Sequence, residues 1–471
     1  MAKKPTEGYS VGGMEKWSYA LYFFGQNIIY VLVASNVQTL FSDVGITAAT
    51  IAGIIFVTKL WDAINDPLFG IIVDKFQFKK GRFLPWLRIS LPFIAVASVA
   101  MMALPANGSI TLKIVWAIIG YVAWDMSYTM CDVPVFVLPI SMTDSVKERT
   151  EILSLGRYIG VLGYALGLIL LPALQSRIGW LGVGIAFTIC GALFMIPACF
   201  KIKERYIVRP EEAVTFKQMA RYIAGNKYML FFYLAFFISS ASSFSSALSL
   251  FFARYNLGDQ DLASIIGAVT MLPLVVVGAI VPSIIKRVDK FYLFVGVLIA
   301  ATTMGVIRYF VGYDILVVYI ILTALQNILI GVYGILMFMF TPDCIEYGTY
   351  HTGERAEGIA SAVQSFFNKL TGSISGPIAM LIIGAFGFVT GEVAVQPASA
   401  LNGIWTCMTL FPCIGTVLAL IFLSFYKLRE KDVQVMAEYN RGKITKDEAE
   451  ALLAKRYGKA ANLTKMVVDH D

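Results

Sequence analysis

Apolar residues form long stretches along almost the entire chain, and short segments rich in Lys, Arg, Asp and Glu separate them. An apolar stretch of about 20 residues is long enough to cross a hydrocarbon layer about 30 Å thick as a helix, which satisfies its own backbone hydrogen bonds there. The pattern therefore predicts an all-α membrane protein with twelve transmembrane helices. The predicted spans cover residues 17–40, 47–73, 84–105, 110–139, 152–173, 179–200, 228–251, 262–285, 291–311, 314–341, 357–388 and 399–426.

The longest internal polar stretch, residues 201–227, follows the sixth predicted span and divides the chain. We predict an N-terminal six-helix half at 1–200, a cytoplasmic middle loop at 201–227, a second six-helix half at 228–426 and a charged cytoplasmic tail at 427–471. Within the tail, residues 443–455 have the pattern of an amphipathic helix, and Thr445 and Glu448 have the spacing of a capping box. We interpret this segment as a solvated tail helix.

Basic residues indicate the orientation of the spans. Twelve spans place both termini on the same side, and the side richer in Lys and Arg faces the cytoplasm. We therefore predict a multi-pass protein of the bacterial inner membrane with both termini cytoplasmic, and its first helix as the insertion signal. The opposite loops hold little basic charge beyond Lys113, Arg177 and Arg254. The basic set is Lys3, Lys4, Lys16, Lys75, Lys79, Lys80, Arg82, Lys147, Arg149, Lys201, Lys203, Arg205, Arg209, Lys286, Arg287, Lys290, Lys427, Arg429 and Lys431.

The composition argues against several classes of protein, including soluble proteins, cofactor-binding proteins and enzymes. The chain is 58% hydrophobic and 15% charged, unlike a soluble domain. Six cysteines show no CxxC pair and there are only two histidines, so we expect no zinc, haem or other cofactor. Basic cytoplasmic loops account for the net charge of +7, so we expect membrane lipid and no nucleic acid as a partner. No Ser/His or Cys/His arrangement lies inside the spans, which argues against an enzyme.

The second span carries an unusual cluster of ionisable groups, and such groups inside a membrane are functional candidates by default. Asp62 and Asp66 lie one turn apart, with Lys59 and Asn65 within a turn of Asp62. Two carboxylates this close must bind a metal ion, share a proton or be neutralised by Lys59. Their hard oxygen atoms suit Na⁺ or H⁺. The alternative is a salt-bridged structural patch at the cytoplasmic end of the helix.

The fourth span presents Asp125, Thr129 and Asp132 as a single polar stripe on an otherwise apolar helix. We expect the stripe to line a cavity, where Thr129 can supply an oxygen to the cation and Asp132 can accept hydrogen bonds from a polyol. For Asp132 a helix-packing charge pair is the alternative, and the role of Asp125 stays open. Aromatic residues suited to stacking on a sugar ring are Trp124, Tyr128 and Phe136.

Three further spans hold polar or charged candidates. Arg157 can tether Asp132 or a substrate oxygen through its planar guanidinium, and Lys369 offers a point charge from the second half. Either can instead balance a buried carboxylate. Arg308, near the outer end of its span, is expected to reach the membrane interface. Uncharged candidates are Gln26 and Asn27 in the first span, with Asn27 open to a sugar hydroxyl or an interhelical hydrogen bond, and Gln364 and Ser365 beside Lys369.

Loop motifs add a resemblance. Residues 70–82 after the second span resemble the cytoplasmic loop motif of the major facilitator superfamily, and a degraded counterpart lies at 285–290 after the eighth. Further motifs are Trp61-Asp62-Ala63-Ile64-Asn65-Asp66-Pro67, Tyr128-Thr129-Met130-Cys131-Asp132-Val133-Pro134, Lys79-Lys80-Gly81-Arg82-Phe83, and the runs 144–149 and 346–358. Through these motifs, nearly the whole chain resembles the glycoside–pentoside–hexuronide:cation symporter family, which includes melibiose permease, with the 346–358 stretch most similar to the glucuronide-carrier branch.

The resemblance implies a coupling-cation site and a sugar site in a protein that works as a monomer. Gln26-Asn27 replaces the Lys-Asp pair of melibiose permease, and Phe136 replaces its stacking Trp, so galactosides are not expected. The neutral Asn27, with Arg157 and Lys369 retained, favours an acidic sugar such as a hexuronide or a sulfonated sugar. The implied cation ligands are Asp62, Asn65, Asp66 and Thr129, and the implied sugar-site residues are Asp132, Arg157, Gln364, Ser365 and Lys369.

These observations predict a secondary active symporter in which Na⁺ or H⁺ drives sugar import. Cation binding neutralises the second-span carboxylates and preorganises the adjacent sugar site, so each ligand strengthens binding of the other. An uncoupled sugar facilitator and a symporter of neutral glycosides or pentosides remain alternatives, and an intramembrane enzyme or a sensor is a more distant one. The charges expected to latch the outward-facing state are Asp74, Arg82, Arg149 and Glu357.

Overall fold

The computed structural model describes residues 11–75, 78, 81–206, 216–285, 288–353, 355–391 and 395–457. Within these ranges some helix side chains, including those of Asp66 and Asp74, lie outside the described set. The described part is helical, with no strand beyond an isolated bridge between Phe78 and Gly81.

The first half of the chain forms long helices that follow the predicted spans. A break after Ala34 divides the first span into two helices that are bent by 41°. Gly179, at φ 70°, forms a kink inside α6 that separates two predicted spans. The elements are α1 (Gly13–Ala34), α2 (Val37–Asp43), α3 (Ala48–Lys75), α4 (Leu84–Met102), α5 (Ile110–Met142) and α6 (Val146–Lys201).

The second half continues the pattern and adds short helices. The predicted span at 228–251 is broken near Ser242, where α8 ends, and it continues into a short π-helix, η1. The elements are α7 (Phe216–Gly225), α8 (Lys227–Ala241), α9 (Ser245–Phe251), η1 (Phe252–Asn256), α10 (Leu262–Ile285), α11 (Lys290–Val311), α12 (Leu316–Met337), α13 (Phe340–Thr352), α14 (Glu357–Ala385), α15 (Ala398–Ser424), α16 (Glu430–Asn440) and α17 (Lys446–Tyr457).

Helices lie in all twelve predicted spans, although fewer than twelve of them are single long apolar segments. Seven helical segments of the described chain are long and apolar enough to cross a membrane, or eight when α1 and α2 count as one broken span. Helix α6 holds two predicted spans in one segment, α8 is too short alone, and the side chains of α3 and α10 are described only in part.

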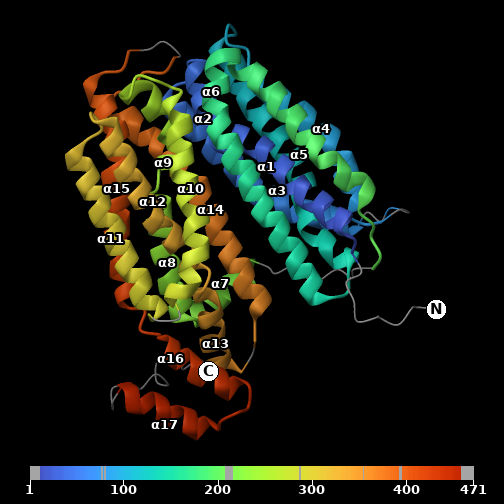
Figure 1. Ribbon diagram of the computed structural model, residues 1–471, viewed down its shortest axis with the longest axis vertical. Helices are drawn as coiled ribbons and strands as arrows, with labels where there is room; N and C mark the ends of the chain where they lie inside the picture. The colour runs from blue at the N-terminus through green and yellow to red at the C-terminus, as the bar shows by residue number, and fades with distance from the viewer. Residues whose placement is uncertain are drawn as a thin grey trace. The chain divides into compact units, whose positions relative to one another are not determined.

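The chain groups into two compact units (Figure 1). The first unit contains Met1–Glu211, Ser245–Ala268 and Gly376–Cys407, and the second contains Glu212–Phe244, Val269–Ser375 and Met408–Asp471. The first unit therefore includes segments from beyond the polar stretch at 201–227. The sequence-based division into two six-helix halves stays a prediction.

Glycines let α1 pack closely against α6, which lies beside it in Figure 1. A Cβ at Gly25 would lie 2.2 Å from the carbonyl oxygen of Gly191, and one at Gly163 would lie 2.4 Å from that of Phe24. Helix association in lipid depends on such close backbone approach, because the hydrophobic effect does not drive it there. This packing fixes the position of Gln26 and its neighbours on α1.

The second unit has an aromatic core onto which the tail folds. Phe232 and Phe340 stack at 4.9 Å between ring centroids, and Met436 of α16 and Leu453 of α17 join the same buried cluster. Asn440 also donates through Nδ2 to the backbone carbonyl of Glu346 at 3.0 Å. The tail is therefore a docked part of this unit.

Two sequence expectations have clear outcomes in the second unit. The capping box is confirmed, because Thr445 N–H donates to Glu448 Oε2 at 2.8 Å and Glu448 N–H donates to Thr445 Oγ1 at 3.3 Å. The expectation for Arg308 is wrong. Its side chain is buried, and its guanidinium donates to Gln326 Oε1 because α12 presents a buried amide acceptor beside it.

Candidate transport site

Asn65 joins α3 to α5 at the predicted cation site. Its Nδ2 donates to Thr129 Oγ1 at 2.9 Å and lies 3.3 Å from Asp125 Oδ2. All three side chains are buried, with 2 to 5% of their surface exposed. The structure thus brings together two of the predicted cation ligands and adds Asp125, whose role the sequence left open.

Lys59 and Asp62 form the charged edge of this cluster. Lys59 Nζ lies 3.5 Å from Asp62 Oδ2 and 5.9 Å from the ring centroid of Tyr121. Asp125 is an electrostatic neighbour of both charges. The ammonium of Lys59 therefore already balances one carboxylate, which is one of the three arrangements that the sequence allowed.

The chemistry of this donor set fits a hard monovalent cation. Asp62, Asp125 and Thr129 carry oxygen atoms that could bind such a cation, and no sulfur or imidazole lies among them. Among the described residues, no group of three or more His, Cys, Asp or Glu side chains is arranged for a metal ion. The predicted set also includes Asp66, whose side chain lies outside the described residues.

Gln26 of α1 and Asp132 of α5 make the central contact of the predicted sugar site. Gln26 Nε2 donates to Asp132 Oδ1 at 2.8 Å, and Gln26 is only 2% exposed. Asn27 instead donates through Nδ2 to the carbonyl of Phe23 in the preceding turn at 2.9 Å. Of this neutral pair, Gln26 is therefore the residue directed at the carboxylate of the stripe on α5.

Arg157 lies beside Phe136 at the edge of the same site. Its guanidinium carbon is 5.4 Å from the centroid of the Phe136 ring, within range of a cation–π interaction. The residue is exposed in the first unit, and its charge acts on Asp132 through space. This position leaves the planar fork of the guanidinium available to a ligand.

An aromatic cluster adjoins the polar stripe. Trp124 and Tyr128 stack at 5.2 Å, and Tyr30 lies 5.0 Å from Tyr128 and 6.2 Å from Tyr164. The sequence singled out Trp124 and Tyr128 but missed Tyr30 and Tyr164. Tyr30 lies one helical turn after Gln26, and this spacing was the available signal.

Two buried polar atoms at this site have no hydrogen-bond partner within the described structure. They are the acceptor Gln26 Oε1 and the donor Trp124 Nε1. Buried polar groups are normally paired, so unpaired ones call for an explanation such as a ligand or solvent. One acceptor and one donor beside a carboxylate and an aromatic cluster suit a ligand rich in hydroxyl groups.

Residues 18–430 match the family model described as MFS/sugar transport protein. The chain belongs to this family. Among curated relatives, the uncharacterized symporter YjmB of Bacillus subtilis is 31% identical over 88% of this chain and 93% of its own. The isoprimeverose transporter of Lactiplantibacillus pentosus is 28% identical over 90% of each chain, and the glucuronide carrier protein homolog of Escherichia coli is 27% identical over 88% of this chain and 92% of its own.

Solved structures support the fold of this sugar transport family member. The nucleoside transporter NupG aligns with a TM-score of 0.63 over 88% of this chain and 99% of its own. Its sequence identity of 13% restricts the comparison to the fold. The chain is a multi-pass membrane transporter of the major facilitator type, and its reported relatives are named as a symporter, an isoprimeverose transporter and a glucuronide carrier protein homolog.

The sugar-site candidates of the second unit share one stretch of α14. Ser365 and Lys369 lie one turn apart and are exposed in that unit, whereas Gln364 is half-buried. Ser373 Oγ donates to the backbone carbonyl of Lys369 at 2.7 Å. Their contribution to the sugar site of this transporter stays a prediction.

The predicted gating charges make local contacts. Arg149 donates through Nε to the carbonyl of Thr143 at 3.0 Å, and Glu357 accepts from Arg355 Nε at 2.6 Å. The backbone N–H of Arg82 donates to Glu204 at 2.8 Å. Glu204 was not among the gating charges predicted from the sequence. Asp74 has its side chain outside the described residues. The inner latch therefore stays a prediction.

Proposed function

We propose that this transporter is a cation-coupled symporter that imports a sugar across the bacterial cytoplasmic membrane as a monomer with both termini inside. The supporting observation is the double contact of Asn65 with Thr129 and Asp125 on α5, the helix that also carries Asp132. Asp132 lies seven residues after Asp125 on the same helix, so cation and sugar candidates stand about two turns apart. A shift of α5 affects both sites, which is a physical basis for coupling.

Residues of α3 and α5 have different roles at the proposed cation site. Lys59 balances Asp62 when no cation is bound, and Asn65 holds Thr129 and Asp125 in place. A bound Na⁺ supplies positive charge that neutralises these carboxylates. We assign Asp125 to the cation site together with Asp62, Asn65, Asp66 and Thr129, and we include no other cofactor. H⁺ is the alternative coupling ion.

The residues of α1, α5 and α6 bind the sugar in this proposal. Gln26 orients Asp132, whose second carboxylate oxygen accepts a hydrogen bond from a hydroxyl group of the ligand. Tyr128 and its stacked neighbour Trp124 face the apolar side of the ring, and Arg157 with Phe136 contacts an acidic group. Asn27 is held by its own helix and adds no charge. For Lys369, Gln364 and Ser365 of α14, sugar binding stays a prediction from the sequence.

We favour an acidic sugar, a hexuronide or a sulfonated sugar, as the substrate. Arg157 and Lys369 are both exposed within their units, and a guanidinium binds carboxylate or sulfonate in a bidentate manner. The relative named as a glucuronide carrier protein homolog agrees with this choice. A neutral glycoside is the second candidate, because another relative is named as an isoprimeverose transporter.

Isothermal titration of the purified protein tests both parts of the proposal. The panel contains glucuronides, sulfonated sugars and neutral glycosides, each titrated with and without Na⁺ and at two pH values. Binding of an acidic sugar that strengthens at least tenfold with Na⁺ supports acidic-sugar symport. Binding of neutral glycosides alone overturns the acidic-sugar assignment, and binding indifferent to both Na⁺ and pH identifies an uncoupled facilitator.

An Arg157→Gln variant in the same titration tests the assigned carboxylate contact. We expect at least a tenfold loss of affinity for the acidic sugar, with neutral glycosides unaffected. An Arg157→Lys variant should recover only part of the loss, since an ammonium cannot make the bidentate contact. Equal losses for acidic and neutral ligands would show that Arg157 acts on the structure of the site.

A further inference from the structure

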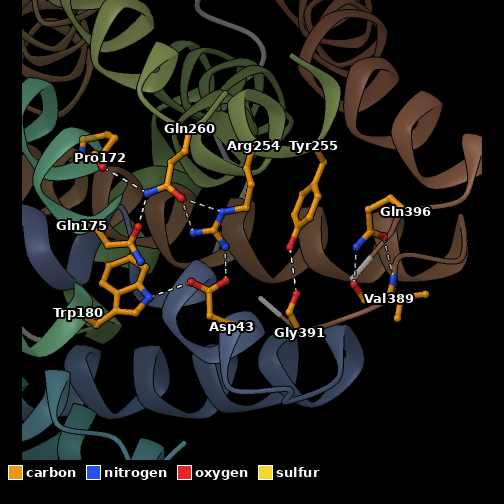
Figure 2. Close-up of polar contacts among 10 residues, drawn as sticks. All are labelled: Asp43, Pro172, Gln175, Trp180, Arg254, Tyr255, Gln260, Val389, Gly391 and Gln396. Atoms are coloured by element: carbon orange, nitrogen blue, oxygen red, sulfur yellow. Dashed lines mark hydrogen bonds and ion pairs between the residues drawn. The ribbon is translucent and has the colours of Figure 1, made fainter. Parts of the chain in front are cut away.

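A buried ion pair lies at the side of the molecule predicted to face outward. Asp43, the last residue of α2, pairs with Arg254 of η1 (Figure 2). The side chains are only 3% and 11% exposed, respectively. Both residues belong to the first compact unit, although 211 positions separate them in the sequence.

Further hydrogen bonds hold each partner of this pair. Trp180 Nε1 donates to Asp43 Oδ2 at 2.8 Å. On the other side, Gln260 Oε1 accepts from Nε and Nη2 of Arg254 at 2.9 and 2.7 Å. Gln260 in turn donates through Nε2 to the carbonyl of Pro172 at 3.2 Å and contacts Gln175 (Figure 2). Carboxylate and guanidinium are thus both oriented for each other.

The π-helix η1 directs neighbouring side chains into separate contacts. While Arg254 reaches Asp43, Tyr255 Oη donates to the carbonyl of Gly391 at 3.2 Å and Asn256 Nδ2 donates to that of Leu401 at 2.9 Å. Short π-helical turns occur frequently at functional sites, because the extra residue per turn redirects side chains. This short helix is therefore tied to Asp43 of α2 and to the backbone carbonyls of Gly391 and Leu401.

A buried ion pair is a poor source of stability, because desolvation of both charges offsets their attraction. Its better-attested use is to specify one arrangement over another. The pair links a residue before the 201–227 stretch to one after it, and major facilitator transporters open by moving their two halves. Asp43 and Arg254 fall in different predicted six-helix halves, so their contact must break before the predicted outer side opens.

We propose that Asp43 and Arg254, oriented by Trp180 and Gln260, form an outer latch that keeps the outer side of the transporter closed. Release of this latch is required for entry of substrate from outside. The sequence analysis placed gating charges only on the cytoplasmic side, so this site is additional to them. The inference rests on a transport cycle, but its test does not depend on which sugar or ion is carried.

Thr39 provides a reporter for opening of the latch. It lies one turn before Asp43 on α2 and is 1% exposed, so a cysteine there is protected while the outer side is closed. The Thr39→Cys protein is placed in right-side-out vesicles and labelled with a membrane-impermeant maleimide. The same protein without this substitution measures the labelling of the native cysteines, and its rate is subtracted.

We expect Asp43→Asn and Arg254→Gln each to raise the labelling rate of Cys at position 39 at least tenfold. In the double variant, D43N/R254Q, the rise should be smaller than the product of the two single effects, since no uncompensated charge remains buried. The matched control is Arg177→Gln. Arg177 lies on the same side in an exposed pair, 3.7 Å from Asp261, and its loss should leave the rate unchanged.

Trp180→Phe is a milder variant that tests the latch even if the charge variants fail to fold. It removes the indole N–H that donates to Asp43 while keeping an aromatic ring, and we expect a severalfold faster labelling in a protein whose melting temperature is close to that of the parent. Parental labelling rates in D43N, R254Q and W180F would overturn the latch. A protein that carries no sugar in any assay, yet shows the predicted labelling, would retain the latch and refute the proposed symport instead.

Discussion

Asn65 and Thr129 lie 64 positions apart in the sequence, and their side chains meet at 2.9 Å between Nδ2 and Oγ1. This hydrogen bond joins the charged second span to the polar stripe of the fourth. It draws Asp125 toward the same amide, and Lys59 with Asp62 lies alongside. The proposed cation site of this sugar transporter is therefore a junction of α3 and α5.

Replacement of Asp125 by Asn tests its assignment to the cation site. The substitution keeps the shape of the side chain and removes a charge from a buried cluster. We expect the Na⁺ affinity to fall about tenfold, equivalent to about 1.4 kcal/mol, while sugar binding without Na⁺ stays within twofold. Isothermal titration calorimetry with Na⁺ as the titrant measures this affinity. A parental Na⁺ affinity in D125N would assign Asp125 to helix packing alone.

Replacement of Lys59 by Met should have the opposite effect on Na⁺ binding. The Lys59 ammonium already balances Asp62 across 3.5 Å, so its removal raises the negative potential at the site. We expect the Na⁺ affinity to rise by about twofold to fivefold, since a partly exposed ion pair contributes up to about 1 kcal/mol. Lys59→Arg, which keeps the charge, is the control. Weaker Na⁺ binding in K59M would show that Lys59 orders the site instead of competing with the cation.

The close packing of α1 on α6 predicts an unusual sensitivity at Gly25. An alanine Cβ there would lie 2.2 Å from the carbonyl oxygen of Gly191, so the helices must separate. We expect Gly25→Ala to destabilise the protein by about 1–3 kcal/mol. Thermal melting in detergent measures the effect. Gly53→Ala on α3, where a Cβ meets nothing within 4 Å, is the matched control and should melt at the parental temperature.

The capping box of α17 predicts a pH dependence of the tail. Hydrogen bonds from the backbone N–H and the hydroxyl of Thr445 lower the pKa of Glu448 below its usual value. The helix end is therefore stabilised above the pKa that Glu448 has in the unfolded tail, and this stabilisation is lost as the pH falls through the lower pKa of the folded state. Hydrogen exchange of residues 446–457 in the full-length protein, corrected for intrinsic rates, measures the effect.

Variants of the cap sharpen this prediction. At neutral pH, the amides of residues 446–457 in Glu448→Gln should exchange as fast as those of the parent protein do below the pKa of Glu448. In Thr445→Ala the same amides should exchange faster than in the parent at every pH. Lys443→Gln, outside the box, serves as the control. Equal protection of the parent at neutral and acidic pH would remove the cap from any role in ordering the tail.

The sequence by itself determined the class of this protein and the identity of most candidate residues. Twelve apolar stretches require a membrane, because only there are so many long apolar helices stable, and Asp62, Thr129 and Asp132 stand out because charge or polarity inside such a stretch is costly. Helical spacing also sufficed for the capping box of Thr445 and Glu448, since both lie in one turn.

Only the tertiary structure decided which of these residues meet. The contacts of Asn65 with Asp125, of Gln26 with Asp132 and of Asp43 with Arg254 join positions 60, 106 and 211 residues apart. Periodicity reports which face of a helix a residue occupies, but not which helix that face meets. Asp43 and Arg254 look like ordinary loop charges in the sequence, because burial and pairing across such distances arise only when the helices pack.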